Sequence, residues 1–323
     1  MCTAISLKGE RHLFGRTLDL ECSYGENVVI TPQEFEFKFR HENGESSHPA
    51  LIGTAHIADG YPLYYDAMNF CGLCAAALNF PSYAVYHKPR RDSINLAAFE
   101  LIPYILSTCD TLDAARERLG KINITDEPFG KTLPSTPLHW IFADKNGAIA
   151  VEPLEIGLKI FDDPFGVLTN SPPFDFHATR LTEFLGLNSY PSQNSLFPDA
   201  DLYEYSRGMG AMGLPGDFSS SSRFVRAVFA RAHSRAVENG NDVSRFFHVI
   251  STVSQPNGCA VTDEGVPIRT LYTSCADADV LTYYFTTYNC RRIRAVRMDQ
   301  ENSSGSSLAV FSMDGKEDVL YLN

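Results

Sequence analysis

The chain has 323 residues and a formal net charge of −12 at pH 7, with 44% hydrophobic and 20% charged residues. This composition is typical of a globular protein and not of a disordered chain. The net negative charge argues against nucleic acid or an anionic membrane surface as a partner, because both bind to positively charged protein surfaces. No signal segment precedes residue 2 and no apolar run approaches the roughly 20 residues of a spanning helix, so we expect a cytoplasmic protein.

The chain begins with Met1-Cys2. Removal of an initiator methionine before a small residue would leave Cys2 with a free α-amine beside its own thiol. Free α-amines titrate at about pH 7.7–8.0 and free thiols at about 8.5, so the two groups can exchange a proton near neutrality. One residue would then hold both a nucleophile and a base. The alternative is an inert, frayed terminus.

Residues 3–7 and 12–16 mix polar and apolar residues around a turn near Gly9, which predicts a hairpin at the start of the chain. A turn centred there places Cys2 opposite Arg16, to within a residue or two. A guanidinium at this place would favour the thiolate and the unprotonated amine. Asp19 could accept a hydrogen bond from the amine and orient it. The alternative for Arg16 and Asp19 is a surface ion pair.

The remaining elements follow from the hydrophobic periodicity. We expect strands at 27–31, 35–39, 51–55, 63–65 and 73–80, helices at 94–106 and 111–119 with Asp110 as N-cap of the second, and strands at 138–143, 148–152, 157–161 and 166–169. A helix at 174–185, an irregular excursion at 188–207, helices at 221–237 and 242–253, and strands at 269–274, 281–287 and 292–298 complete the chain. This order predicts an α+β fold with two antiparallel sheets and two helical layers, in one domain that spans residues 1–323.

The eight cysteines are scattered along the chain, which favours free thiols over a disulfide framework. Cys71 and Cys74 form a CxxC, which could be a redox pair or half of a zinc site, but no second ligand pair follows. The histidines show no metal-ligand spacing, and the chain has neither a dinucleotide fingerprint nor a phosphate loop. We therefore expect no cofactor and no metal.

Several short motifs resemble, in order and spacing, those of the choloylglycine hydrolase family, which holds bile salt hydrolases and penicillin V acylases. The motifs are Met1-Cys2-Thr3, Phe14-Gly15-Arg16 with Asp19, Leu78-Asn79-Phe80-Pro81, Leu138-His139-Trp140, Leu168-Thr169-Asn170, Gly213-Leu214-Pro215-Gly216-Asp217 and Ser222-Arg223-Phe224-Val225-Arg226. The match covers nearly the whole chain. It implies an N-terminal-nucleophile (Ntn) hydrolase with a four-layer αββα sandwich.

The resemblance also implies roles for individual residues. Cys2 would be the nucleophile after loss of Met1, and its amine would shuttle protons. Arg16 and Asp19 would set the state of amine and thiol. The Asn79 backbone amide and the Asn170 side chain would form an oxyanion hole, and Arg223 would polarise the site. From the residues alone, the alternatives are turn-forming asparagines and, for Arg223, an arginine at a helix start paired with Asp217.

The sequence Leu78-Asn79-Phe80-Pro81 looks like the bile-salt subgroup. The implied reaction is hydrolysis of glycine- or taurine-conjugated bile acids. Another activity of the same family, on penicillin V or other N-acyl amides such as acyl-homoserine lactones, is the alternative. Phe70-Cys71 and Ser82 depart from the family's usual residues beside the proposed oxyanion strand. By analogy, the residues that would line an apolar mouth for the steroid are Leu18, Leu20, Ile57, Tyr61, Leu133 and Leu138.

The segment 188–207 resembles the one that joins family members into homotetramers, so we expect a homotetramer. Two hypotheses from other functional classes remain. A thiol-redox protein would depend on Cys71 and Cys74. A non-catalytic binding protein for sterols or acyl groups would keep Met1.

Overall fold

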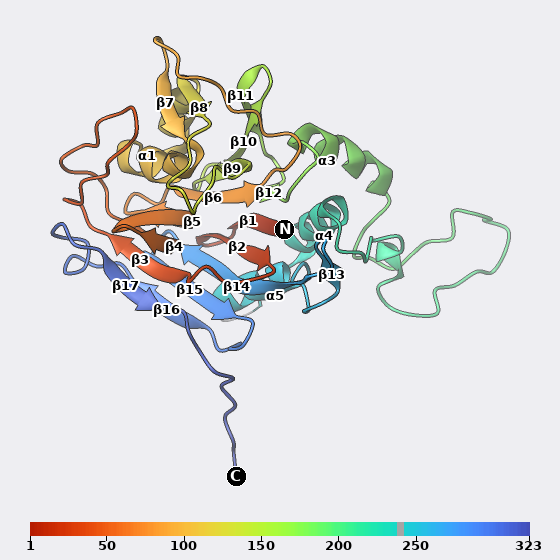
Figure 1. Ribbon diagram of the computed structural model, residues 1–323. Helices are drawn as coiled ribbons and strands as arrows, with labels where there is room; N and C mark the ends of the chain where they lie inside the picture. The colour runs from red at the N-terminus through yellow and green to blue at the C-terminus, as the bar shows by residue number, and fades with distance from the viewer. Residues whose placement is uncertain (238–241) are drawn as a thin grey trace.

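Two antiparallel β-sheets lie face to face at the centre of the molecule, and helices cover the outer face of each (Figure 1). The structure is a computed structural model, which describes residues 1–237 and 242–323. The four layers form the αββα sandwich expected from the order of strands and helices. We name the two sheets by the residues Cys2 and Asn79 that they carry.

The Cys2 sheet begins with the predicted N-terminal hairpin. Its strand order is β12 (Val167–Leu168), β1 (Cys2–Lys8), β2 (His12–Leu20), β14 (Pro267–Asp277), β15 (Thr282–Thr287) and β16 (Arg294–Arg297), and β13 (Ala260–Val261) pairs with β14. Nearly all residues of β1 and β2 are buried, because one face packs on the second sheet and the other on helices.

The Asn79 sheet comes mainly from the first half of the chain. Its strand order is β11 (Gly157–Asp162), β10 (Ala148–Leu154), β9 (Leu138–Ala143), β6 (Cys74–Asn79), β5 (Tyr61–Asn69), β4 (Leu51–Ala58), β3 (Asn27–Thr31) and β17 (Ala309–Ser312). The central strand β6 lies over β1 and β2 of the other sheet. This packing brings the C-terminal end of β6 close to the start of the chain.

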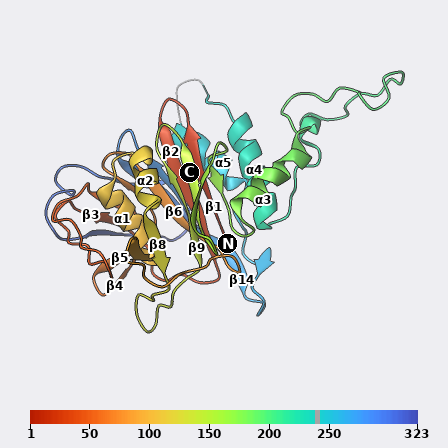
Figure 2. The same cartoon turned by 90° about the horizontal axis from the view of Figure 1, so that it is seen from above.

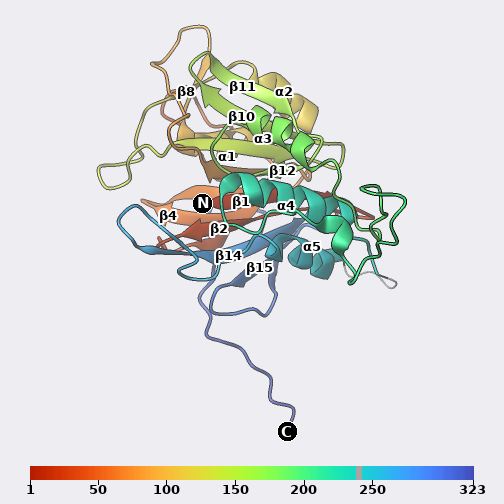
Figure 3. The ribbon, with the colours of Figure 1, turned by 90° about the vertical axis from the view of Figure 1, so that its right-hand side faces the viewer.

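The helices fall into two groups, one for each sheet (Figure 3). Helices α1 (Leu101–Thr108) and α2 (Leu112–Leu119) pack on the Asn79 sheet, whereas α4 (Ser220–His233) and α5 (Asp242–Ser251) pack on the Cys2 sheet. Helix α3 (Phe174–Arg180) contacts α4. Within the described ranges, no helix combines the length and the apolar character that a bilayer crossing requires.

Gly15 explains how β2 and β14 approach each other beside Arg16. A β-carbon at position 15 would lie 2.0 Å from the carbonyl oxygen of Ser274 on β14. Only glycine avoids this clash without moving the strand. The glycine at the centre of the Phe14-Gly15-Arg16 motif is therefore required by the close packing of β2 and β14.

Two predicted elements before residue 110 are wrong. Residues 94–97, which we expected to open a helix, form the strand β7 (Ile94–Ala97), which pairs in parallel with β8 (Ile122–Thr125). The α1 helix begins only at Leu101, after a short 3₁₀ turn at Ala98–Glu100. Residues 35–39 are not a strand; Phe37 instead packs in an aromatic cluster with Phe35, Phe39 and Tyr61. At 35–39, aromatic packing prevailed over the local apolar pattern, and at 94–97, parallel pairing with β8 gives a strand.

The helix boundaries differ from the prediction by a few residues. Thr111, not Asp110, caps α2, because its side chain accepts the Ala114 amide. Helix α3 is shorter than expected and continues as a 3₁₀ turn at Leu181–Phe184. Helix α4 ends at His233 and α5 at Ser251, both earlier than predicted. Strands β8, β13 and β17 were not predicted.

An arm made of residues 188–207 projects from the body beyond α3, as predicted for an irregular excursion (Figure 2). A 3₁₀ turn at Met209–Ala211 follows it and leads back to α4. The arm exposes large apolar side chains, namely Tyr190, Leu196, Phe197, Leu202, Tyr203 and Tyr205. The C-terminal residues also extend away from the body (Figure 1).

Candidate active site

Cys2 is the first residue of β1 and is almost completely buried, with 2% of its surface exposed. It pairs with Leu18 across the hairpin, whereas Arg16 pairs with Ala4. The register is therefore two positions away from a direct pairing of Cys2 with Arg16, because the turn lies about one residue later than Gly9. Side chains that are paired or two apart along a strand share a face, so Cys2, Leu18 and Arg16 all face the Asn79 sheet.

Arg16 joins the two sheets in the space beside Cys2. Its Nη1 donates to the carbonyl oxygens of Tyr65 on β5 (3.0 Å) and Ala77 on β6 (2.5 Å). Its Nη2 is buried and has no hydrogen-bond partner among the described residues. Burial opposes the charge, but the Cys2 sulfur and nearby acidic groups outweigh it and raise the pKa of Arg16. The guanidinium stays charged, and a buried cation with an unused donor lies beside the thiol.

Asp19 lies on the opposite face of β2 from Cys2. Its carboxylate accepts hydrogen bonds from Thr270 Oγ1 (2.7 Å), Gln255 Nε2 (3.1 Å) and Thr17 Oγ1 (3.2 Å). Its carbonyl oxygen accepts a bond of 2.6 Å from the amine of Met1. In the chain that still carries Met1, the terminal amine is therefore bound by the backbone of Asp19 and not by its carboxylate.

Asn170 connects Cys2 with Arg223 of helix α4. Its Oδ1 accepts from the Cys2 backbone nitrogen (2.7 Å) and from Arg223 Nη2 (2.8 Å). Both partners are donors, so they identify which end of the amide is the oxygen. The Nδ2 end then points the other way and donates to the carbonyl oxygen of Asn79 (2.7 Å). Asn170 thus links Cys2 to the end of β6 through both ends of its amide.

Arg223 is fully buried, and burial lowers its pKa from the usual arginine value. Its Nη1 donates to the Cys2 carbonyl oxygen (2.5 Å) and to Thr3 Oγ1 (2.6 Å). It does not pair with Asp217, whose carboxylate binds the Ser219 amide and the Ser222 hydroxyl. Arg223 therefore fastens the first residue of the sheet to helix α4 and orients the Asn170 amide.

Asn79 ends strand β6 and lines the cavity at Cys2. The amide of the next residue, Phe80, donates to the carbonyl oxygen of Pro137 beside β9. Successive amides of a strand point to opposite sides, so the Asn79 N–H is directed away from β9. Asn79 thus lines the same cavity as Cys2, with its backbone N–H directed away from β9.

A cavity of about 410 Å³ opens over Cys2 between the two sheets. Of the residues predicted for an apolar mouth, Leu18, Leu20, Leu133 and Leu138 line it. Ile57 and Tyr61 do not line it, because they pack in the core between the Asn79 sheet and α1. The walls also contain residues that we did not predict, including Tyr24, Tyr65, Phe99, Phe129 and Pro134. Aromatic and aliphatic walls suit a large apolar group.

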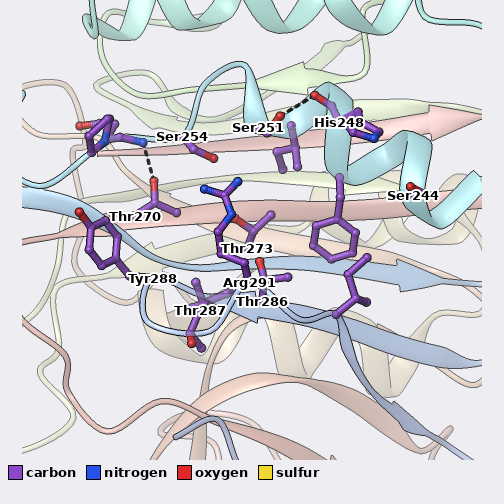
Figure 4. A pocket seen from close by; sticks show the side chains of 16 residues that line it. Ser244, His248, Ser251, Ser254, Thr270, Thr273, Thr286, Thr287, Tyr288 and Arg291 are labelled. Atoms are coloured by element: carbon purple, nitrogen blue, oxygen red, sulfur yellow. Dashed lines mark hydrogen bonds between the residues drawn. The ribbon is translucent and has the colours of Figure 1, made fainter. Parts of the chain in front are cut away.

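A second, larger cavity of about 650 Å³ lies on the outer side of the Cys2 sheet, against α5 (Figure 4). It does not include Cys2, so we place the chemistry in the smaller cavity. Gln255 and Thr270 line the larger cavity and also bind the Asp19 carboxylate. No motif marks these two residues, and only the fold brings them to Asp19.

The CxxC pair is poorly suited to thiol exchange. Burial raises the pKa of Cys74 well above the ordinary thiol value. Burial and a hydrogen bond to Asp110 raise the pKa of Cys71 to about 11. Both thiols are therefore protonated at neutral pH, and the thiolate is the form that reacts.

Comparison with known proteins identifies the family. Residues 2–317 match the linear amide C–N hydrolases, choloylglycine hydrolase family. The chain belongs to this family. A bile salt hydrolase/transferase from Lactiplantibacillus plantarum is 42% identical over all of both chains, and one from Clostridium perfringens is 33% identical over the same share. This choloylglycine hydrolase family member is therefore an amidase that acts on linear amides.

Solved structures support the same family. A mutant conjugated bile acid hydrolase from Clostridium perfringens superimposes with a TM-score of 0.92 over all of both chains, at 32% identity. A penicillin V acylase from Agrobacterium tumefaciens gives a TM-score of 0.75 at 21% identity, over 96% of this chain and 90% of the acylase. The second likeness shows the fold alone. The αββα sandwich of this family member is the Ntn-hydrolase fold that we predicted.

Proposed function

We propose that this enzyme hydrolyses the amide bond of glycine- or taurine-conjugated bile acids, with Cys2 as its nucleophile after removal of Met1. The observation that carries the proposal is the position of Cys2. It lines a cavity with apolar walls that Asn79 also lines, and Asn170 links its backbone nitrogen to the end of β6 by hydrogen bonds. The relatives named as bile salt hydrolases support the choice of substrate.

In the first half of the reaction, the α-amine of Cys2 accepts the thiol proton and the thiolate attacks the amide carbon. The Arg16 guanidinium beside the sulfur favours the thiolate. The carbonyl oxygen becomes an oxyanion, which the Asn79 N–H and the Asn170 Nδ2 stabilise. The protonated amine then gives its proton to the leaving nitrogen, glycine or taurine departs, and the bile acid remains on Cys2 as a thioester.

In the second half, the free amine takes a proton from a water molecule that attacks the thioester carbon. A second oxyanion forms at the same donors and collapses to the carboxylic acid and the Cys2 thiol. An amine in place of water at this step would give a new amide. The word transferase in the names of the relatives motivates this second activity. Added amino acids should then appear in conjugates detectable by mass spectrometry.

The cavity supports a rigid apolar acyl group. The predicted residues Leu18, Leu20, Leu133 and Leu138 line it together with Phe99 and Phe129. Ile57 and Tyr61 do not contact the acyl group in this proposal, because they pack in the core behind the residues that line the cavity. Penicillin V and other N-acyl amides, including acyl-homoserine lactones, are the alternative substrates, because they share the amide and an apolar acyl side.

We further propose one domain over residues 1–323, a cytoplasmic location and a homotetramer joined through the arm at 188–207. The arm exposes Leu196 (89%), Tyr203 (82%) and Tyr205 (85%), and a large exposed apolar surface is typical of a protein interface. Deletion of residues 190–206 should convert the assembly into smaller species. Light scattering measures this directly, and an unchanged mass after deletion would reject the arm as the interface.

A substrate panel tests the proposed function. Glycocholate, taurocholate, phenoxymethylpenicillin and an acyl-homoserine lactone are compared by release of amine or acid, with Cys2→Ala as the inactive control. We expect the bile-acid conjugates to be cleaved fastest. The mass of the intact chain should lack Met1. Full activity of Cys2→Ala, or retention of Met1 in active enzyme, would refute the proposed nucleophile.

A further inference from the structure

A histidine and a glutamate form a buried pair beneath the proposed oxyanion hole. His139 on β9 and Glu152 on β10 are both fully buried, and His139 Nδ1 lies 3.0 Å from Glu152 Oε1. The other ring nitrogen, Nε2, lies 2.9 Å from the carbonyl oxygen of Thr169. Neither side chain lines the cavity at Cys2.

The partners of His139 determine how many protons the pair holds. A carbonyl oxygen only accepts, so Nε2 must carry a proton and donate it to Thr169. The contact between Nδ1 and Oε1 requires one further proton between these two atoms. The pair therefore has no net charge. Its internal hydrogen bond joins β9 to β10, and the bond from His139 Nε2 links this sheet to the Thr169 carbonyl.

The pair holds both ends of the loop that carries Asn170. His139 binds the carbonyl of Thr169, where the loop begins. Glu152 Oε1 accepts a bond of 3.0 Å from the amide of Phe174, where the loop ends and helix α3 begins. The Asn170 amide is thus attached, through its own backbone, to two adjacent strands of the Asn79 sheet.

The same histidine also contacts the segment that carries Asn79. Its ring stacks on Phe80, the residue after Asn79, with ring centres 4.3 Å apart and an angle of 8° between the planes. His139 pairs with Leu78 across β6 and β9. One ring therefore touches both segments whose donors must be held at a fixed separation.

We propose that His139 and Glu152 are positioning residues, which set the distance between the Asn79 amide and the Asn170 side chain. This inference rests on the proposed roles of those two asparagines. A buried polar pair adds little to stability compared with apolar residues of similar volume. Its two backbone bonds and its stacking fix geometry, and a displacement of about 1 Å in an active site can cost about 100-fold in rate.

Glu152→Gln is the first test, because the two side chains have nearly the same shape. Oε1 must accept from the Phe174 amide and also complete the bond to His139 Nδ1. An amide oxygen cannot give Nδ1 a proton, and an amide nitrogen in its place would oppose the Phe174 N–H. We expect kcat to fall roughly 10- to 100-fold while KM changes less than about threefold.

Two reagents separate the oxyanion hole from the thiol. Iodoacetamide alkylates Cys2 without forming an oxyanion, whereas an aldehyde analogue of the bile acid forms a hemithioacetal whose oxygen occupies the hole. In Glu152→Gln the affinity for the aldehyde should fall in parallel with kcat, and the alkylation rate should stay near that of the wild type. A parallel fall of both would overturn the proposal, because it would indicate general damage to the site.

A double variant tests whether Glu152 acts through Asn170. In the Asn170→Ala background, adding Glu152→Gln should change kcat less than about twofold, since the group being positioned is absent. A full multiplicative loss would contradict the proposal. His12→Gln is the matched control, because His12 is also buried but lies at the far end of the hairpin, bound to Ser6. It should retain wild-type kcat.

Should Glu152→Gln fail to fold, the double variant His139→Phe with Glu152→Met removes both polar groups and keeps the volume. It should fold, and its kcat should still be low; wild-type kcat in this variant would refute the pair's role. The fall in kcat relative to the wild type can be measured with any amide substrate that the wild type cleaves. A wild type inactive on bile-acid conjugates would count against the proposed substrate and not against the positioning pair.

Discussion

The Cys2 backbone nitrogen and the Asn170 Oδ1 lie 2.7 Å apart, although 168 positions separate the two residues in the chain. In the proposed mature enzyme, which lacks Met1, this nitrogen would be the terminal amine and Asn170 its acceptor. The same asparagine directs its Nδ2 toward Asn79. In the proposed reaction, Asn170 would orient the base with one end of its amide and donate to the oxyanion with the other.

Replacement of Asn170 by alanine should lower kcat by about 100- to 1,000-fold, because an oxyanion donor is lost. Steady-state kinetics with a conjugated bile acid measure the change. Asn146→Ala, in the exposed turn between β9 and β10, is the control and should behave as the wild type. A loss below about tenfold would mean that Asn170 does not contact the oxyanion.

Replacement of Arg16 by methionine should slow the alkylation of Cys2 at neutral pH at least tenfold, since the neighbouring cation that favours the thiolate is removed. The rate of labelling with iodoacetamide measures this. Arg11→Met removes an arginine that pairs with Asp277 at the other end of the hairpin. It should not change the rate. An unchanged rate in Arg16→Met would exclude an electrostatic role for Arg16.

His12 should make the fold sensitive to acid. Burial lowers its pKa to about 4, below the value of about 6.5 in an unfolded chain. The unfolded chain therefore binds the proton first, so the contribution to stability is complete above pH 6.5 and is lost as the pH falls toward 4. The loss is up to about 3 kcal/mol for this residue. Burial lowers the pKa of His177 to about 4 as well, so it acts in the same direction.

Urea unfolding at pH 7 and pH 4.5 measures this effect. Between these two values, His12→Gln should lose less stability than the wild type, whatever its stability at pH 7. A variant whose pH dependence equals that of the wild type would show that His12 is charged in the folded protein.

Leu133→Ala should raise KM for conjugated bile acids several-fold with little effect on the melting temperature, because Leu133 lines the cavity and is partly exposed. Ile57→Ala is the comparison. Ile57 packs against the core under α1 and does not line the cavity, so its truncation should lower stability by about 1–3 kcal/mol and leave KM unchanged. If Ile57→Ala raised KM and Leu133→Ala left KM unchanged, the acyl group would bind in a different part of the sheet interface.

The N-terminal hairpin and the hairpin of β9 and β10 follow from local pattern and turn residues, and both were predicted well. The start of β7 was not, because four apolar-rich residues carry no period that separates strand from helix. At the site, the motifs predicted Cys2, Arg16, Asp19, Asn79, Asn170 and Arg223. Hydrogen bonds link Cys2, Asn79, Asn170 and Arg223, and Arg16 lines the cavity with Cys2, whereas the Asp19 carboxylate lies on the other face of β2. The catalytic roles of these residues stay predictions. The contacts of Asp19 with Thr270 and Gln255 have no sequence signal.

By itself, the sequence determined the family, most of the strands and helices, and the residue types that amide cleavage needs, because periodicity and short motifs are properties of neighbouring residues. Only the tertiary structure decided the hairpin register that puts Leu18 and not Arg16 opposite Cys2, the orientation of the Asn170 amide, and the burial of the pair of His139 and Glu152. The register follows from the position of the turn. The other two features depend on packing between elements, where residues far apart in the chain compete for the same space and hydrogen-bond partners.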